Sequence, residues 1–101
     1  MNDLLMLLRK IRERPELYLG EVSLKLLRAL ITGYILCEQD NGKREVEYSS
    51  DFLLFVEDKF DVLHSGRDWA SIIYMHAQDD REALYIFYEL LDDFLASGGC
   101  F

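Results

Sequence analysis

Any chemistry in this sequence would come from two histidines, two cysteines or adjacent carboxylates. His64 and His76 stand twelve positions apart, and neither has a cysteine or a second histidine at the spacing that zinc ligands use. A metal site would require the fold to bring His64, His76 and Cys37 together. Phosphate-binding glycine loops and a Gly-x-Ser-x-Gly nucleophile elbow are also missing. The sequence therefore predicts no metal, no cofactor and no enzymatic activity, and an enzyme would need a cleft that gathers a histidine with carboxylates.

Adjacent carboxylates occur at Glu57-Asp58, Asp79-Asp80 and Asp92-Asp93. Neighbouring positions on a helix point about 100° apart, so the two members of such a pair do not face each other. Shared acid–base chemistry is therefore not expected from them. We expect these carboxylates to lie on solvated helix faces instead.

Cysteine usage and the N-terminus indicate the compartment. Cys37 and Cys100 are too few and too poorly placed for a disulfide framework, which predicts a reducing, cytoplasmic location. The apolar run Leu4–Leu8 has no basic segment before it and is followed at once by the basic run Arg9–Arg14. We therefore expect neither a signal peptide nor a membrane span. The basic run fits the end of a helix better than a phosphate site.

Hydrophobic periodicity predicts the elements that would carry these side chains. Half of the 101 residues are apolar, enough for one core, so we expect a single all-α domain over residues 1–101, a compact bundle of about five helices. The first helix would end before Pro15, which disfavours helix at the preceding residue. The segment Lys43–Tyr48 is expected to be a loop, with a hairpin near Val46 as the alternative. The expected helices run from about Asp3 to Arg14, from Ser23 to a stop at Asp40-Asn41-Gly42, and from a cap at Ser49 or Ser50 along the stripe Phe52 to Phe60. A short fourth helix is expected after a turn at Ser65-Gly66, with Trp69, Ile72, Ile73 and His76 on one side, and a fifth from a cap at Asp79 or Asp80 to the pair Gly98-Gly99.

Charge is the most informative feature of the composition. The net charge of -8 repels phosphate backbones and anionic lipid headgroups, so nucleic acid and membranes are not expected partners. Residues 1–37 carry a net charge of +2, whereas residues 38–61 and 79–101 each carry -5. A basic protein surface would complement these two acidic segments.

The acidic segments predict a partner-binding surface if the helices that carry them share a face. Tyrosines nearby could serve as anchors, because tyrosine joins apolar area to a hydroxyl group at low entropic cost. Of Tyr85 and Tyr88, we expect at least one to lie in the core. The alternative is that the acids are spread evenly and only maintain solubility. The predicted partner-binding residues are Glu45, Glu47, Tyr48, Asp51, Glu57, Asp58, Asp61, Tyr85, Asp92 and Asp93.

Spaced residues over most of the chain resemble small bacterial immunity-type proteins. The residues that carry this resemblance are Arg14-Pro15-Glu16-Leu17-Tyr18-Leu19-Gly20, Ser23-Leu24, Gly33-Tyr34, Phe52–Phe60, Trp69–Ile73 and the run EALYIFYELLDDFL. Such proteins accompany polymorphic or contact-dependent growth inhibition toxins, and each neutralises its own toxin by binding it. These positions fit a scaffold rather than a binding site: Pro15 can begin a helical turn, Gly20 can take a positive φ, and Gly33 would let another helix approach.

Resemblance and charge together favour one function. We expect an immunity protein that binds a cognate toxin, with a basic nuclease as the expected class, through an acidic surface. The alternative is a non-catalytic adaptor or regulatory subunit of an unrelated bacterial complex, which composition alone does not separate from the first.

Overall fold

The protein is described by a computed structural model that covers residues 3–40, 50–62, 66 and 68–99. This part of the chain is all-α, as predicted, and contains no strand. No described helix is long and apolar enough to cross a membrane. The helices are α1 (Asp3–Glu13), α2 (Pro15–Leu19), α3 (Leu24–Asp40), α4 (Ser50–Phe60), α5 (Trp69–His76) and α6 (Asp80–Ala96).

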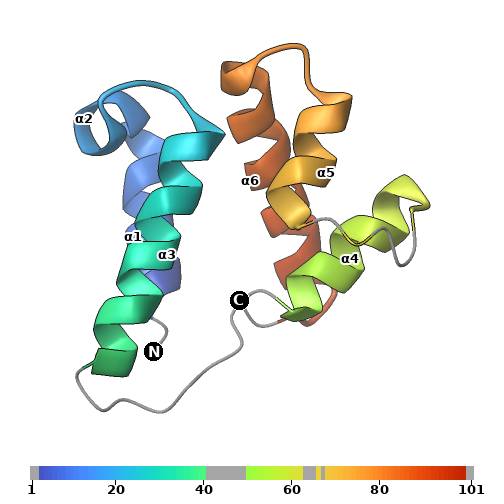
Figure 1. Cartoon of the computed structure of the whole chain (residues 1–101), viewed down its shortest axis with the longest axis horizontal. Helices are drawn as coiled ribbons and strands as arrows, with labels where there is room; N and C mark the ends of the chain where they lie inside the picture. Colours follow the sequence, from blue (N-terminus) through green and yellow to red (C-terminus); the bar gives the residue numbers. More distant parts are fainter. Residues whose placement is uncertain (1–2, 41–49, 63–65, 67, 100–101) are drawn as a thin grey trace.

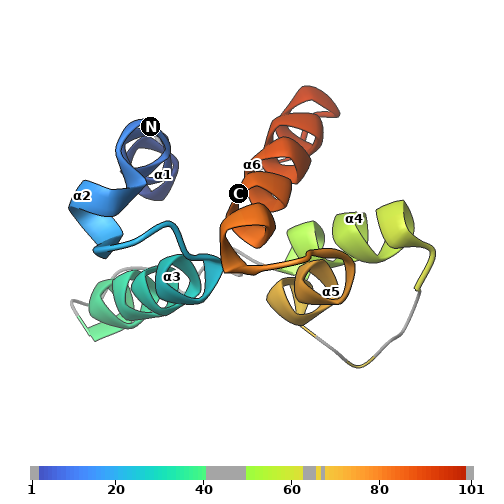
Figure 2. The ribbon, with the colours of Figure 1, turned by 90° about the horizontal axis from the view of Figure 1, so that it is seen from above.

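The last helix, α6, stands between two groups of helices. Helices α1, α2 and α3 lie on one side of it, and α4 and α5 lie on the other (Figures 1 and 2). The side chains that α6 sends to the two sides differ: aromatic side chains pack toward α4 and α5, and mainly aliphatic neighbours meet it from α1 and α3.

Helix α2 is the element that periodicity missed. A break at Pro15 was expected, and the chain does leave α1 there, but it continues directly into a short helix whose first residue is Pro15. Proline is favoured at this position because the first turn needs no N–H donor and φ is already suitable. Gly20 then ends α2 with a φ of 88°, the left-handed conformation that glycine adopts without strain.

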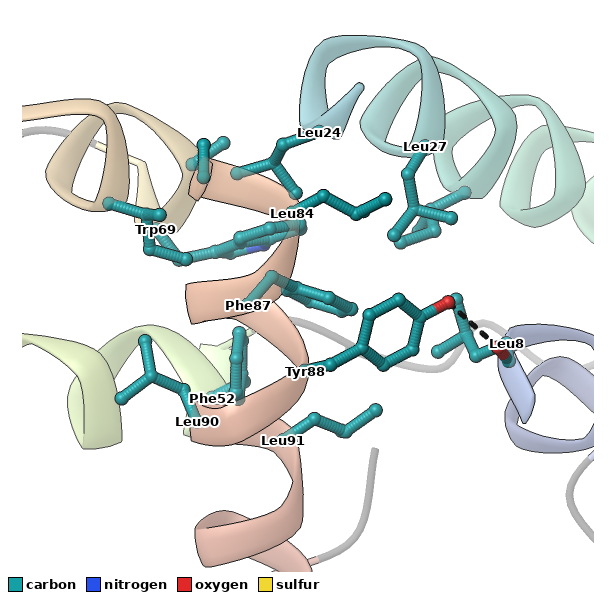
Figure 3. Close-up of a cluster of buried hydrophobic side chains, with 14 of the residues drawn as sticks. Leu8, Leu24, Leu27, Phe52, Trp69, Leu84, Phe87, Tyr88, Leu90 and Leu91 are labelled. Atoms are coloured by element: carbon teal, nitrogen blue, oxygen red, sulfur yellow. Dashed lines mark hydrogen bonds between the residues drawn. The ribbon is translucent and has the colours of Figure 1, made fainter. Parts of the chain in front are cut away.

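The core forms around α6 from both sides (Figure 3). On the α4 and α5 side it is aromatic: Phe52 packs edge-on against Trp69, Phe87 and Phe94, with ring centroids 5.4 to 5.6 Å apart. Trp69 is thus a core residue, only 5% exposed. On the α1 and α3 side the core is mainly aliphatic. The buried residues of α1 and α3 are Leu4, Leu8, Ile11, Leu24, Leu27 and Ile31.

Buried Tyr88 connects α6 to α1. Its ring extends from α6 toward α1, and its hydroxyl donates a 2.7 Å hydrogen bond to the carbonyl oxygen of Leu8 (Figure 3). Burial raises the pKa of this phenol, so the hydroxyl stays a donor at neutral pH. Tyr85, by contrast, is 52% exposed, so the prediction that at least one of the two tyrosines belongs to the core is confirmed.

The N-termini of α3 and α6 meet at one carboxylate. Asp79 caps α6 by accepting a 2.7 Å hydrogen bond from the Glu82 N–H, which leaves Asp80 for another role. Asp80 accepts from the N–H of Leu24 at 2.9 Å, and from the hydroxyls of Ser23 and Tyr74. This carboxylate therefore stabilises the start of α3 and ties it to α5 and α6.

Gly33 was expected to permit a close helix approach, but a Cβ built there meets nothing within 4 Å, so that expectation is wrong. His76 is exposed and stacks on Phe60, which packs against the core. The segment Lys43–Tyr48 and His64 lie outside the described residues.

Candidate protein-binding surface

The predicted partner-binding residues fall into four groups in the structure. Glu45, Glu47 and Tyr48 lie outside the described residues. Glu57 is only 4% exposed, and so it does not contribute to an exposed acidic surface. Helix α4 is packed against both α5 and α6, which makes its buried face broader than a single stripe and encloses the position after Val56. The remaining residues lie on the outer faces of α4 and α6.

The outer face of α4 carries Asp51 and Asp58, and Asp61 follows the last residue of the helix; all three are exposed. Positions 51, 54 and 58 lie on one side of a helix, and Leu54 between them is 55% exposed. The apolar side chain is therefore flanked by carboxylates on a face that packs against no described helix. Single exposed apolar side chains are common on protein surfaces, so this face by itself does not distinguish a binding surface from a solubilising one.

Asp61 has an additional backbone role at the end of α4. Its φ is 57°, in the left-handed region that favours glycine. The Val62 N–H bonds the Glu57 carbonyl at 2.9 Å and the Asp61 N–H bonds the Asp58 carbonyl at 3.2 Å, which together form a Schellman cap. Glycine would occupy this position with less strain, so the carboxylate of Asp61 is kept at a cost to stability.

The outer face of α6 is the second acidic surface. Tyr85, Asp92 and Asp93 are exposed and share this face, as their spacing of seven and eight positions requires. Between them stands exposed Glu89, which was not among the predicted binding residues. The same periodicity identifies it, because residue 89 follows 85 by four positions and precedes 93 by four. Within the described part of the chain, no ion pair joins Glu89.

Two of these carboxylates already have partners within the fold. The Arg12 guanidinium donates to both carboxylate oxygens of Asp92, at 2.7 and 2.8 Å. This hydrogen bonding lowers the pKa of Asp92 and raises the pKa of Arg12. Asp93 has a looser contact, with its Oδ2 lying 3.6 Å from Lys59 Nζ. The negative charge of Asp92 is therefore largely compensated, and that of Asp93 less so.

A hollow of about 300 Å³ lies beside this face, where α6 meets the C-terminal ends of α4 and α5. His76 stacks on Phe60 with ring centroids 4.1 Å apart and a 17° angle between the planes. The Nδ1 of His76 lies 3.0 Å from the Ile72 carbonyl, which fixes the ring. The described residues that line the hollow are Lys59, Phe60, His76, Ile86, Glu89, Leu90 and Asp93.

The hollow gathers a histidine with carboxylates, which is the arrangement that an enzyme would need. Its described lining, however, contains no hydroxyl or thiol nucleophile, and Asp93 is engaged with Lys59. Among the described residues, no three His, Cys, Asp or Glu side chains are grouped so that they could hold a metal ion. An aromatic platform, an apolar floor and exposed carboxylates are groups suited to holding a cation.

A second hollow, of about 290 Å³, lies on the opposite flank of α6. Its described lining includes Tyr85, Tyr88 and Glu89, together with Pro15 at the start of α2. Here the cation is already present: the Arg12 guanidinium carbon lies 5.1 Å from the centroid of the Tyr88 ring. Glu89 lines both hollows and thus stands on the ridge between them.

Comparisons with known proteins provide no relative: no protein-family model, no curated protein and no solved structure matches this chain. The surface itself is therefore the basis for a functional proposal.

Proposed function

We propose that this protein binds a basic protein through the outer face of α6 and the adjoining end of α4, and that this partner is a toxin that it neutralises. The observation that carries the binding proposal is the outer face of α6. There, exposed Tyr85 and Glu89 share one side of the helix, and Glu89 lines a hollow whose described lining contains two carboxylates and a single lysine. The toxin is inferred from the resemblance to immunity-type proteins.

At this surface, charge would mainly increase the association rate, and buried apolar area would provide most of the affinity. The net charge of -8 would steer a basic partner toward the protein and raise the association rate by roughly 10- to 1,000-fold at low salt. Affinity would come mainly from apolar area that is buried in the complex, for which Tyr85 and Leu54 are 52% and 55% exposed.

The test uses the product of the adjacent reading frame as the candidate toxin. We expect the two proteins to co-purify, and we expect an excess of this protein to abolish the toxin's activity. Full toxin activity in the presence of excess protein would remove the toxin proposal. Tight binding without inhibition would instead assign the protein to the adaptor class.

Charge reversal locates the surface. Glu89→Lys is expected to slow association by about tenfold at low salt, with a smaller effect at high salt because ions screen exposed charges. Glu21→Lys makes the same change in net charge at an exposed residue between α2 and α3, away from the proposed surface. Equal effects of the two variants would show that net charge alone matters and would contradict the assignment to α6.

A further inference from the structure

The α1 flank of α6 shows how this fold holds an arginine. Arg12 lies over the ring of Tyr88, with its guanidinium carbon 5.1 Å from the ring centroid, and it forms paired hydrogen bonds to Asp92 at 2.7 and 2.8 Å. An aromatic face and a carboxylate together match the planar, five-donor geometry of guanidinium.

The opposite flank offers the same kinds of groups from other residues. Phe60 covers one face of the His76 ring at 4.1 Å, and His76 is nevertheless exposed, so solvent reaches the remainder of the ring. Glu89 and Asp93 supply carboxylates, and Ile86 belongs to the apolar lining. No arginine is among the described residues that line this hollow.

We propose that the hollow between α4, α5 and α6 receives an arginine side chain of the basic partner. The proposal rests on the proposed binding function and names the residue type that this surface recognises. The aliphatic part of the arginine packs against Ile86 and Leu90. Its guanidinium stacks on the His76–Phe60 pair and donates to Glu89. The lining carries two carboxylates against one lysine, so an added positive charge is electrostatically favoured.

Lysine fits this hollow less well than arginine. A compact ammonium does not stack on a ring as guanidinium does, and it cannot form the paired hydrogen bonds that a carboxylate accepts. The hollow already has a lysine at its edge, and that side chain makes only loose contacts. Lys59 Nζ lies 3.6 Å from Asp93 and 5.6 Å from the centroid of the Phe55 ring, and its side chain is 46% exposed. An incoming guanidinium competes with Lys59 for Asp93.

The experiment titrates the isotope-labelled full chain with three blocked tripeptides, followed by NMR. The probes are acetyl-Gly-X-Gly-amide with arginine, lysine or citrulline at the central position. Citrulline keeps the shape of arginine without its charge. We expect the arginine peptide to bind with a Kd on the order of millimolar, about fivefold tighter than the lysine peptide. Shifts should concentrate at Lys59, Phe60, His76 and Glu89.

Variants test whether the NMR shifts caused by the arginine peptide arise from binding in the hollow. Glu89→Gln should reduce arginine binding by roughly fivefold, and Lys59→Met should increase it because Asp93 is released. Lys10→Met, which makes the same charge change at an exposed residue of α1, is the matched control and should change little.

Two results would overturn the proposal: equal binding of the arginine and lysine peptides, or shifts spread over all acidic faces. Either result leaves co-purification with the toxin candidate untouched. Conversely, the hollow could prove selective for arginine in a protein that does not bind the toxin candidate. That result would contradict the proposed toxin partner and support the proposed arginine site.

Discussion

On the flank that faces α1 and α3, specific polar contacts add to an aliphatic core. On the flank that faces α4 and α5, α6 is joined mainly by packed rings, and its polar contacts there are the Tyr74–Asp80 hydrogen bond and the loose Lys59–Asp93 pair. On the first flank, Tyr88 bonds the Leu8 carbonyl, Arg12 pairs with Asp92, and Asp80 caps α3. On the other flank, Phe87 and Phe94 pack against Phe52.

This difference between the two flanks determines which carboxylates remain available to bind a partner. The carboxylates on the α1 and α3 flank are used by the fold, because each accepts strong hydrogen bonds from a neighbouring helix. On the α4 and α5 flank the rings provide cohesion and Asp93 makes only a loose 3.6 Å contact with Lys59, while Glu89, on the ridge between the two hollows, remains exposed. Carboxylates that the fold does not need are those through which an acidic protein can bind a cation at little cost to stability.

The largest expected effect concerns Tyr88. Tyr88→Ala should lower the free energy of unfolding by about 3 to 5 kcal/mol, because it leaves a cavity and removes the bond to Leu8. Urea denaturation measures this loss. His76→Ala on the other flank should cost under about 1 kcal/mol, because the ring is exposed and makes one stacking contact. Similar losses in both variants would contradict the distinction between the flanks.

A smaller loss is expected at the joint between α3 and α6. Asp80→Ala should lower the free energy of unfolding by about 2 kcal/mol, because it removes the acceptor at the start of α3 and leaves half-buried donors unpaired. The neighbouring variant Asp79→Ala, which removes only the local cap of α6, should cost about 1 kcal/mol. A larger loss for Asp79→Ala would show that the contact between helices is not the important one.

Asp80 should also shape the stability of the protein in acid. Burial raises the pKa of this carboxyl, but hydrogen bonds from Ser23, Tyr74 and the start of α3 outweigh it, so the pKa lies below its ordinary value. Its contribution is therefore complete above about pH 4, the usual pKa of an unfolded aspartate, and is lost as pH falls through the lower folded pKa. Asp80→Asn should flatten the decline of the unfolding free energy below pH 4, and an unchanged slope would exclude Asp80 as a cause.

The adjacent residues Asp92 and Asp93 test the difference between the two flanks of α6. Asp92→Asn should lower the free energy of unfolding by about 1 kcal/mol because it weakens the paired contact with Arg12, whereas Asp93→Asn should change it by less than about 0.5 kcal/mol. In partner binding we expect the reverse order, with Asp93→Asn the more damaging. Calorimetry measures the affinity of each variant for the partner, and urea denaturation measures its stability. Together they show whether the variant that loses more stability is the one that loses less affinity.

At Asp61 the expected effect is a small gain in stability. Asp61→Gly should raise the free energy of unfolding by roughly 0.5 to 1 kcal/mol, because glycine adopts the left-handed conformation without strain. If the carboxylate belongs to the binding surface, the same variant should bind the partner more weakly. Asp61→Asn separates the two effects, since it tolerates this φ and lacks the charge. A gain in stability with unchanged binding would remove Asp61 from the surface.

Local features of the sequence determined most of the helices. Hydrophobic periodicity predicted helices where α1, α3, α4, α5 and α6 lie, and Ser23 and the pair Asp79-Asp80 marked two helix starts. The cap hydrogen bonds are made by Ser23 and, of the pair, by Asp79. These features depend on residues three or four positions apart, so the chain carries them without reference to its fold. Helix α2 was missed because its five residues are too few to show a period.

The tertiary structure alone decided what each carboxylate does. Asp92 meets Arg12 across 80 positions of sequence, and Asp80 reaches the start of α3 across 56. Glu57 and Asp58 are neighbours, yet the first is buried and the second is exposed. Sequence spacing shows which side of a helix a residue occupies. Whether that side meets an arginine, another helix or water depends on long-range packing, because the free energy of a charge is set by the groups around it in space.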